Sequence, residues 1–255
     1  MSPRTAPPAL PADLEAGLKR LKLSTIRTQA PEILLTAKTQ RWAPEETLRV
    51  LVDLEIRSRD ASNTRNRMTN ARFPVVKTFD EFHLAESSIP RASHDYLITL
   101  DWIGRADNLC LVGPAGTGKT HYLIALGRAA VEHGHKVRYF TAIELVEHLY
   151  RAVADNTVGR AIEAVCRNEL IIVDEIGFAP LDHTGCQLMF RLIAAAYERR
   201  SVAIASHSPF ENWGRFLPDQ PTAVSLLDRL CHHAHIITTT GDSYRLTHRT
   251  AGGNA

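Results

Sequence analysis

The stretch "LVGPAGTGKTHYLIAL", residues 111–126, places the octapeptide GPAGTGKT between an apolar segment and a segment with helical periodicity. The octapeptide, residues 113–120, fits the pattern G-x-x-x-x-G-K-[ST] in full. Such a loop turns its backbone N–H groups inward around phosphate oxygens, and the N-terminus of the following helix adds a partial positive charge. The stretch therefore predicts a phosphate-binding loop between a strand and a helix.

Each residue type in this loop has a predicted task. The glycines permit unusual torsions and close approach, Lys119 reaches the β- and γ-phosphates, and Thr120 offers a hydroxyl to Mg²⁺. The expected cofactors are thus ATP and Mg²⁺. The predicted nucleotide-binding residues are Gly113, Pro114, Ala115, Gly116, Thr117, Gly118, Lys119 and Thr120.

A second motif, "LIIVDE" at residues 170–175, is an apolar stretch that ends in two carboxylates. Ligands of open α/β sheets bind at the carboxyl ends of strands, so Asp174 is expected to hold Mg²⁺ through water. Glu175 is placed to polarise an attacking water, which favours hydrolysis over transfer to a small acceptor. The alternative for the pair is a helix-capping or turn role.

Two further polar positions leave alternatives open. His207 ends the apolar stretch "SVAIASH", where it either senses the γ-phosphate and orients the water or forms a simple turn. Arg229 lies in "TAVSLLDRLCHH" and is either a finger inserted into a neighbouring subunit's site or the local partner of Asp228.

The four cysteines are widely scattered, with no zinc-like spacing, and are expected to be reduced. The segment "CHHAH" crowds one cysteine and three histidines into residues 231–235. On an extended or helical backbone these side chains diverge onto different faces, so the prediction is that they form no metal site.

Strands and helices alternate through the rest of the chain, which predicts an α/β fold with a mainly parallel sheet covered by helices on both faces. Thr141 and Glu144 have the spacing of a capping box. The predicted strands are 108–113, 136–142, 169–175, 201–207, 235–240 and 243–248. The predicted helices are 119–132, 143–154, 157–168, 182–199 and 222–230.

The N-terminal part is helical and basic. Residues 1–78 contain 14 Lys/Arg against 8 Asp/Glu, which indicates a polyanionic partner or a solvated helix face. A helix is predicted to start at Pro44, and Pro31 to break a helix or start another. The predicted domains are 1–73 (helical, contacting a partner or DNA), 74–82 (linker), 83–249 (ATPase) and 250–255 (disordered tail).

The composition differs from that of disordered or fibrous proteins. With 44% hydrophobic and 23% charged residues, the chain has the composition of a soluble globular protein. No apolar run reaches the roughly 18 residues of a membrane span, and the N-terminus has no signal-like core. A cytoplasmic location is therefore expected.

The blocks "LVGPAGTGKTHYLIAL", "LIIVDEIGFAPLD", "SHSPFENWGRFLPD" and "LLDRLCHHAHII" stand in the order and spacing of the IstB-like ATPases, which the chain resembles over nearly its whole length. These transposition helpers are similar to the DnaC helicase loaders and belong to the AAA+ initiator clade. The resemblance implies Walker A at 113–120, Walker B at Asp174 and Glu175, and an intersubunit finger at Arg229. His207 stands where the family usually has Asn, which puts its water-orienting role in question.

The resemblance further implies an ATP-dependent homo-oligomer on double-stranded DNA that recruits or activates a transposase. Only 26 residues follow Arg229, which leaves no room for a helical lid, so nucleotide binding is expected to depend on a neighbouring protomer. Three alternatives remain: a DnaC-like helicase loader that binds single-stranded DNA, a small-molecule or nucleotide kinase, and a DNA-bending protein with a vestigial nucleotide site.

Overall fold

The computed structural model describes residue 7 and residues 9–244. The chain divides into two compact units, Met1–Asn66 (unit 1) and Arg67–Ala255 (unit 2). The expected disordered tail at 250–255 and residues 245–248 of the strand predicted at 243–248 lie outside the described residues. Among the described helices, none combines the length and apolar character that a membrane span requires.

Unit 1 holds helices α1 (Ala12–Arg20) and α2 (Ser24–Gln40) and most of α3 (Pro44–Ala71), which starts at the predicted proline. The prediction that Pro31 breaks a helix is wrong, because α2 runs through it. A proline removes one backbone hydrogen bond, and packing can offset that loss. Ala30 and Ala37 are buried on either side of the proline, so packing holds both halves of the helix.

A buried carboxylate joins α3 to the start of α2. Glu55 accepts hydrogen bonds from the backbone N–H groups of Thr25 and Ile26, at 2.9 and 3.0 Å, and from Arg59 Nε at 2.9 Å. Burial opposes its ionisation, but the Ile26 N–H and the Arg59 guanidinium outweigh burial and hold the pKa of Glu55 below its usual value. The carboxylate therefore satisfies backbone donors at the N-terminus of α2.

Unit 2 is built on a five-stranded parallel sheet with the order β2-β3-β4-β1-β5. The predicted parallel α/β fold is therefore confirmed. Since all strands run the same way, the sheet has one carboxyl edge and one amino edge. The strands are β1 (Asn108–Val112), β2 (Val137–Thr141), β3 (Leu170–Ile176), β4 (Ser201–Ser206) and β5 (Ala234–Thr238).

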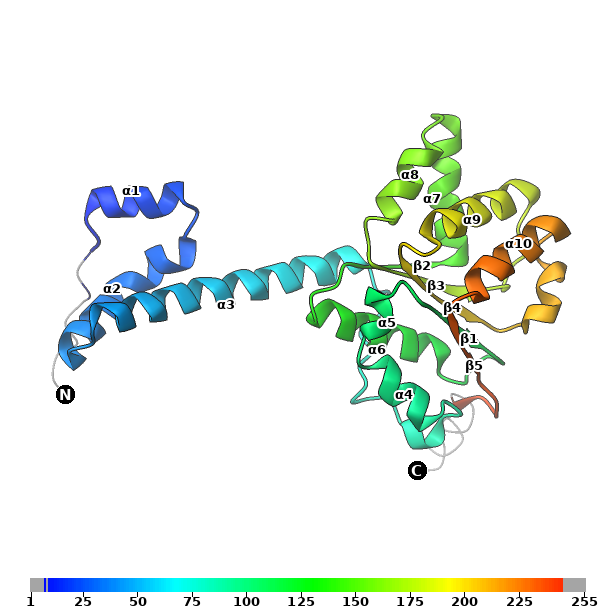
Figure 1. The fold of residues 1–255 in the computed structure, drawn as a ribbon, viewed down its shortest axis with the longest axis horizontal. Coiled ribbons are helices and arrows are strands. Elements are labelled where there is room, and N and C mark those ends of the chain that lie inside the picture. The colour runs from blue at the N-terminus through cyan, green and yellow to red at the C-terminus, as the bar shows by residue number, and fades with distance from the viewer. Residues whose placement is uncertain (1–6, 8, 245–255) are drawn as a thin grey trace, which may run out of the picture. The chain divides into compact units, whose positions relative to one another are not determined.

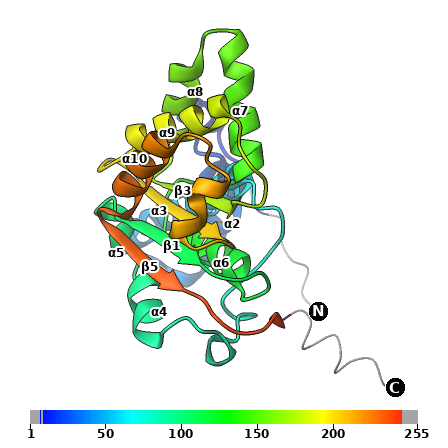
Figure 2. The same ribbon diagram turned by 90° about the vertical axis from the view of Figure 1, so that its right-hand side faces the viewer.

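Helices cover both faces of the sheet, as Figures 1 and 2 show from two directions. On one face lie α7 (Ala142–Ala154), α8 (Val158–Val165), α9 (His183–Ala196) and α10 (Gln220–Cys231). On the other lie α4 (Arg91–Leu97), α5 (Asp101–Gly104) and α6 (Lys119–Glu132). Successive residues of β3 alternate between the two cores, with Ile171 and Val173 in one and Leu170 and Ile172 in the other.

The predicted strands and helices of unit 2 are found, with shifts at their ends, except the strand predicted at 243–248, because neither of its described residues, Ser243 and Tyr244, lies in a strand. The capping box of α7 is confirmed, since Glu144 N donates to Thr141 Oγ1 and Thr141 N to a Glu144 oxygen. Helix α9 stops at Ala196 rather than 199, because Tyr197 leaves the helical conformation with a ψ of 126° and Glu198 then takes a left-handed φ of 54°. Helices α4 and α5 and the 3₁₀ turns Leu84–Glu86 and Phe210–Arg215 were not predicted.

Candidate nucleotide site

The predicted phosphate-binding loop connects β1 to α6 at the carboxyl edge of the sheet. Gly113 N donates to Ser206 O at the end of β4, at 3.0 Å, which fixes the first residue of the loop. Gly113 and Gly116 have φ values of 151° and 84°. A Cβ at either position would lie 2.0 or 2.1 Å from Thr239 O or Ser243 Oγ, so only glycine fits there.

Lys119, the first residue of α6, folds its side chain into this loop. Its Nζ donates to Gly113 O and Pro114 O, both at 2.6 Å, and the side chain is buried. Burial lowers the pKa of Lys119, while the negative charge of Asp174 opposes that shift. The Lys119 ammonium group therefore lies between these two carbonyl oxygens, close enough to Asp174 for the two charges to attract each other.

Asp174 is 1% exposed near the end of β3. One carboxylate oxygen accepts from Tyr139 Oη at 2.9 Å and the other from the Glu175 backbone N at 2.8 Å. Burial and the charge of Asp174 raise the pKa of Tyr139 far above its usual value, which keeps its hydroxyl a donor. Tyr139 on β2 was missed in the sequence, because only the pairing of β2 with β3 brings it to Asp174.

The backbone of β3 is irregular at the two carboxylates. Val173 pairs with Ile204 and Ile176 with Ser206, so one more residue lies on β3 than on β4. Glu175 has a φ of 59° and an exposed side chain. A bulge of this kind re-aims a side chain, and here it separates the buried Asp174 from the exposed Glu175.

A segment far along the chain lies against the loop. Thr239 is fully buried after β5, and its hydroxyl lies 2.7 Å from that of Thr117. Tyr244 N donates to Gly116 O at 3.1 Å. Sequence reasoning missed this contact, because no local pattern relates residues 239–244 to residues 113–117.

The aromatic residues of the predicted linker also pack beside the loop. The Phe82 ring lies 3.0 Å from where a Cβ of Gly118 would be, and His121 Nε2 lies 2.9 Å from Thr78 O. Phe79 and Phe82 both meet the ring of Tyr122, edge to face. The segment before the ATPase core therefore covers the first turn of α6.

Arg229 does not join this group within the chain. It lies near the end of α10, and Asn108 Nδ2 at the start of β1 donates to the neighbouring Leu230 O at 2.9 Å. The phosphate-binding loop leaves the other end of β1. Arg229 donates to Ser225 O at 3.0 Å and stacks over the Phe190 ring at 5.0 Å. The ion pairs found among the described residues do not include Asp228 with Arg229.

The remaining predicted site residues lie at the carboxyl edge. Thr120 is half-buried in the first turn of α6, and Pro114 and Ala115 are exposed on the loop. His207 is exposed and follows directly after β4.

These residues fit a magnesium nucleotide. The loop offers backbone donors and an ammonium group to phosphates, which is the donor set that polyphosphates require. Thr120 and Asp174 offer hydroxyl and carboxylate oxygens, which Mg²⁺ prefers. Gly113 and Gly116 are positions where only glycine lets the loop pack this closely against Thr239 and Ser243.

The chain is similar to curated proteins over most of its length. It is 33% identical over 242 residues to an insertion-sequence IS21 ATP-binding protein of Pseudomonas aeruginosa, with 94% of this chain and 91% of that protein covered. It is 32% identical over 228 residues to the corresponding IS5376 protein of Geobacillus stearothermophilus, with 89% and 91% covered.

Solved structures share the fold at low identity. AMPPCP-bound DnaA from Aquifex aeolicus has a TM-score of 0.53 at 18% identity, and the match covers 68% of this chain and 53% of that chain. The structure of DnaI also has a TM-score of 0.53, at 14% identity, with 64% and 91% covered. This chain spans about half the length of the DnaA structure, and the likeness identifies a P-loop AAA+ fold.

The family model described as "IstB-like ATP binding protein" matches residues 16–252 of this chain. The chain therefore belongs to the family of IstB-like ATP-binding proteins.

Proposed function

We propose that this protein is a Mg²⁺-dependent ATPase that assembles with ATP on double-stranded DNA and brings a transposase to it. The family and the insertion-sequence names of its relatives support a role in transposition. The finer parts of the proposal rest on the arrangement of charged residues in unit 2.

The carboxyl edge supplies the residues for binding and hydrolysis. The loop amides and Lys119 hold the phosphates, and Thr120 and Asp174 hold Mg²⁺, which neutralises charge that develops on the phosphate oxygens. Glu175 accepts the proton of the attacking water. His207 follows β4, which neighbours β3 in the sheet, and it stands where the family usually has Asn.

One observation carries the proposal: Arg229 and the phosphate-binding loop lie at opposite edges of one sheet. The five residues of β1 separate them, and at about 3.3 Å per residue this distance is roughly 16 Å. Arg229 therefore acts on the nucleotide of the next subunit, where its charge stabilises the transferring phosphoryl group. ATP then joins neighbouring subunits, and hydrolysis releases them.

A basic cluster on unit 2 supports binding to the DNA backbone. Burial, together with the nearby Arg72, lowers the pKa of Arg138, and burial together with Arg138 and Arg151 lowers the pKa of His148. The arginine charges in this cluster disfavour one another, with Glu144 as an opposing charge on Arg138, and a phosphate placed among the arginines relieves their repulsion. Such contacts predict salt-sensitive binding with weak sequence preference.

We assign the contact with the transposase to unit 1. Leu48, Val52 and Ile56 follow helical spacing along α3 and are 62, 41 and 50% exposed. An exposed apolar row of this kind is suited to packing against a partner helix. Unit 1 also carries basic side chains for a second contact with DNA.

Assemblies that mix two variants test whether Arg229 acts on a neighbouring subunit. Arg229→Ala alone should lose about 10³-fold or more of the DNA-stimulated ATPase rate. Mixing it with Glu175→Gln should restore part of that rate, because the Glu175→Gln subunit supplies Arg229 to a neighbour that keeps Glu175. Arg191→Ala, an exposed arginine on α9, is the matched control and should keep full activity. Absence of recovery at every mixing ratio would exclude action between subunits.

Size measurements test the assembly. Sedimentation of the full chain with ATP or ADP, and with duplex or single-stranded DNA, should give large complexes with ATP and duplex together. Assembly on single strands alone would replace the transposition role with that of a helicase loader. Assembly that ignores the nucleotide would remove ATP as the switch.

A further inference from the structure

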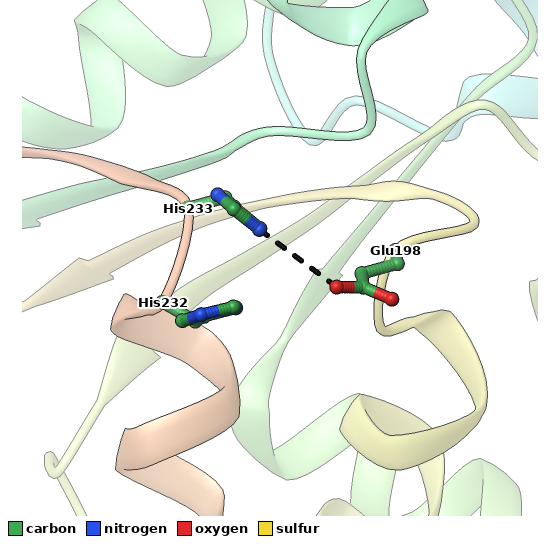
Figure 3. A group of neighbouring side chains, drawn as sticks. All are labelled: Glu198, His232 and His233. Carbon is green, nitrogen blue, oxygen red and sulfur yellow. Dashed lines mark ion pairs between the residues drawn. The ribbon is translucent and has the colours of Figure 1, made fainter.

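Three side chains with metal-binding atoms meet at the amino edge of the sheet. Glu198 follows α9, and His232 and His233 form the turn between α10 and β5. All three are exposed, and each offers one nitrogen or oxygen within 4.8 Å of the others. Figure 3 shows a nitrogen of His233 directed at the Glu198 carboxylate, at 3.8 Å, with His232 beside them.

The prediction that the residues of "CHHAH" diverge is wrong for two of them. Cys231 ends α10 and Ala234 begins β5, so the chain turns between the two histidines, and their ring centroids lie 4.1 Å apart. The other two members do leave the group. Cys231 hydrogen-bonds to Cys110, and His235 packs on the Tyr96 ring.

A buried side chain fixes the two loops that carry these residues. Asn108, the first residue of β1, donates from Nδ2 to Leu230 O, and its Oδ1 accepts from Val202 N at the start of β4, both at 2.9 Å. Its backbone N donates to His233 O at 2.7 Å. The turn after α10 and the loop after α9 are therefore held against one another.

Tyr197, which lies outside this group of three, sets the orientation of one ring. Tyr197 Oη lies 2.7 Å from His232 Nδ1. Ligating histidines generally use their second nitrogen for such a hydrogen bond, which fixes the ring and leaves the first nitrogen for the metal. Here the bond leaves His232 Nε2 available.

We propose that Glu198, His232 and His233 bind one divalent transition-metal ion of the zinc class. Two imidazoles and one carboxylate match the preferences of Zn²⁺, Ni²⁺ and Cu²⁺, whereas Mg²⁺ and Ca²⁺ prefer sites built of oxygen alone. Water completes the coordination, as in other zinc sites with three protein ligands. Tyr197 is a positioning residue that acts through His232.

Binding requires a small closure of the group. Ligand atoms about 2.0–2.1 Å from Zn²⁺ lie about 3.3 Å apart in a tetrahedron. The present separations of up to 4.8 Å must therefore shrink, and exposed side chains can do this by changing rotamers. The backbone held by Asn108 does not need to move.

This site lies at the opposite edge of the sheet from the phosphate-binding loop and does not rest on the proposed function. Lys119→Ala should leave zinc binding unchanged, and His232→Ala should leave ATP binding unchanged. Failure of either proposal can therefore be recognised separately.

The test uses the untagged full chain, freed of metal with a chelator and kept in excess Mg²⁺. Calorimetric titration with ZnCl₂ should give one ion per chain, and CoCl₂ should give the visible absorption of a four-coordinate cobalt site. His232→Ala, His233→Ala and Glu198→Gln should each weaken zinc binding more than about tenfold, and Tyr197→Phe about tenfold. His235→Ala is the matched control, with a histidine two residues away that faces Tyr96, and should change nothing.

Two results would overturn the proposal. One is the absence of a stoichiometric zinc ion on the wild-type chain under these conditions. The other is zinc binding that survives all three ligand variants, or that His235→Ala weakens equally, since the metal would then bind elsewhere.

Discussion

The two edges of the sheet hold their charged residues differently. At the carboxyl edge, Lys119 and Asp174 are buried, and each makes at least two hydrogen bonds with the loop, with β2 or with β3. At the amino edge, Arg229 is half-buried, and the side chains of Glu198 and His233 are more than half exposed. Buried charges with several partners are fixed before a ligand arrives, whereas exposed ones adapt to it.

This difference indicates that the two edges of the sheet meet their ligands in different ways. The carboxyl edge is pre-organised for the phosphates of its own nucleotide. Under our two proposals, the groups at the amino edge gain their strongest partners from outside the chain, namely the next subunit for Arg229 and a metal ion for the histidines. Substitutions at the two edges should therefore have different consequences, and the predictions below follow from the largest effect to the smallest.

Lys119→Ala should remove ATP binding, with a loss of about 2–5 kcal/mol in binding free energy, because the phosphates lose their buried cation. Titration with a fluorescent ATP analogue measures this loss, and sedimentation with DNA should show no assembly. The exposed Lys136→Ala is the control. Normal nucleotide affinity in Lys119→Ala would show that the carboxyl edge is not organised around this side chain.

Glu175→Gln should keep ATP binding and lower kcat by about 10²–10⁴-fold, because the amide cannot accept the proton of water. Single-turnover hydrolysis measures the rate, and DNA complexes should persist. Glu163→Gln, an exposed carboxylate on α8, should behave as wild type. Turnover at the wild-type rate would assign the base to another residue.

Tyr139→Phe should weaken the dependence on Mg²⁺ without removing ATP binding. The change takes one donor from the buried Asp174, at a cost of about 1–3 kcal/mol. We expect the Mg²⁺ concentration for half-maximal ATPase activity to rise by about tenfold. Tyr122→Phe is the control, since that hydroxyl contacts His94 instead. An unchanged Mg²⁺ requirement would mean that Asp174 needs no support from β2.

Phe190→Leu should have the smallest effect. It removes the ring beneath Arg229 while keeping apolar packing, and a partly exposed cation–π contact contributes about 0.5–1 kcal/mol. The ATPase rate of the assembly should fall about two- to fivefold, with nucleotide affinity unchanged. A loss as large as that of Arg229→Ala would show that the amino edge is as rigid as the carboxyl edge.

Local patterns predicted much of this molecule. The strands and helices from β1 to β5 follow from alternation, apolar runs and caps, and the loop at 113–120 follows from its glycines and lysine. Helices α4 and α5 were missed because they are short, with seven and four residues. The break predicted at Pro31 is wrong because the burial of Ala30 and Ala37 in α2 outweighs the local preference of proline against a helix interior.

The sequence by itself determined the parallel α/β fold and the phosphate-binding loop, because both depend on residues close together in the chain. The tertiary structure decided what those residues meet. Strand pairing brings Tyr139 to Asp174, residues 239–244 cover the loop, and the turn after α10 brings two histidines to Glu198. It also puts Arg229 at the edge away from its own loop. Such contacts depend on strand order and register, which sequence spacing does not encode.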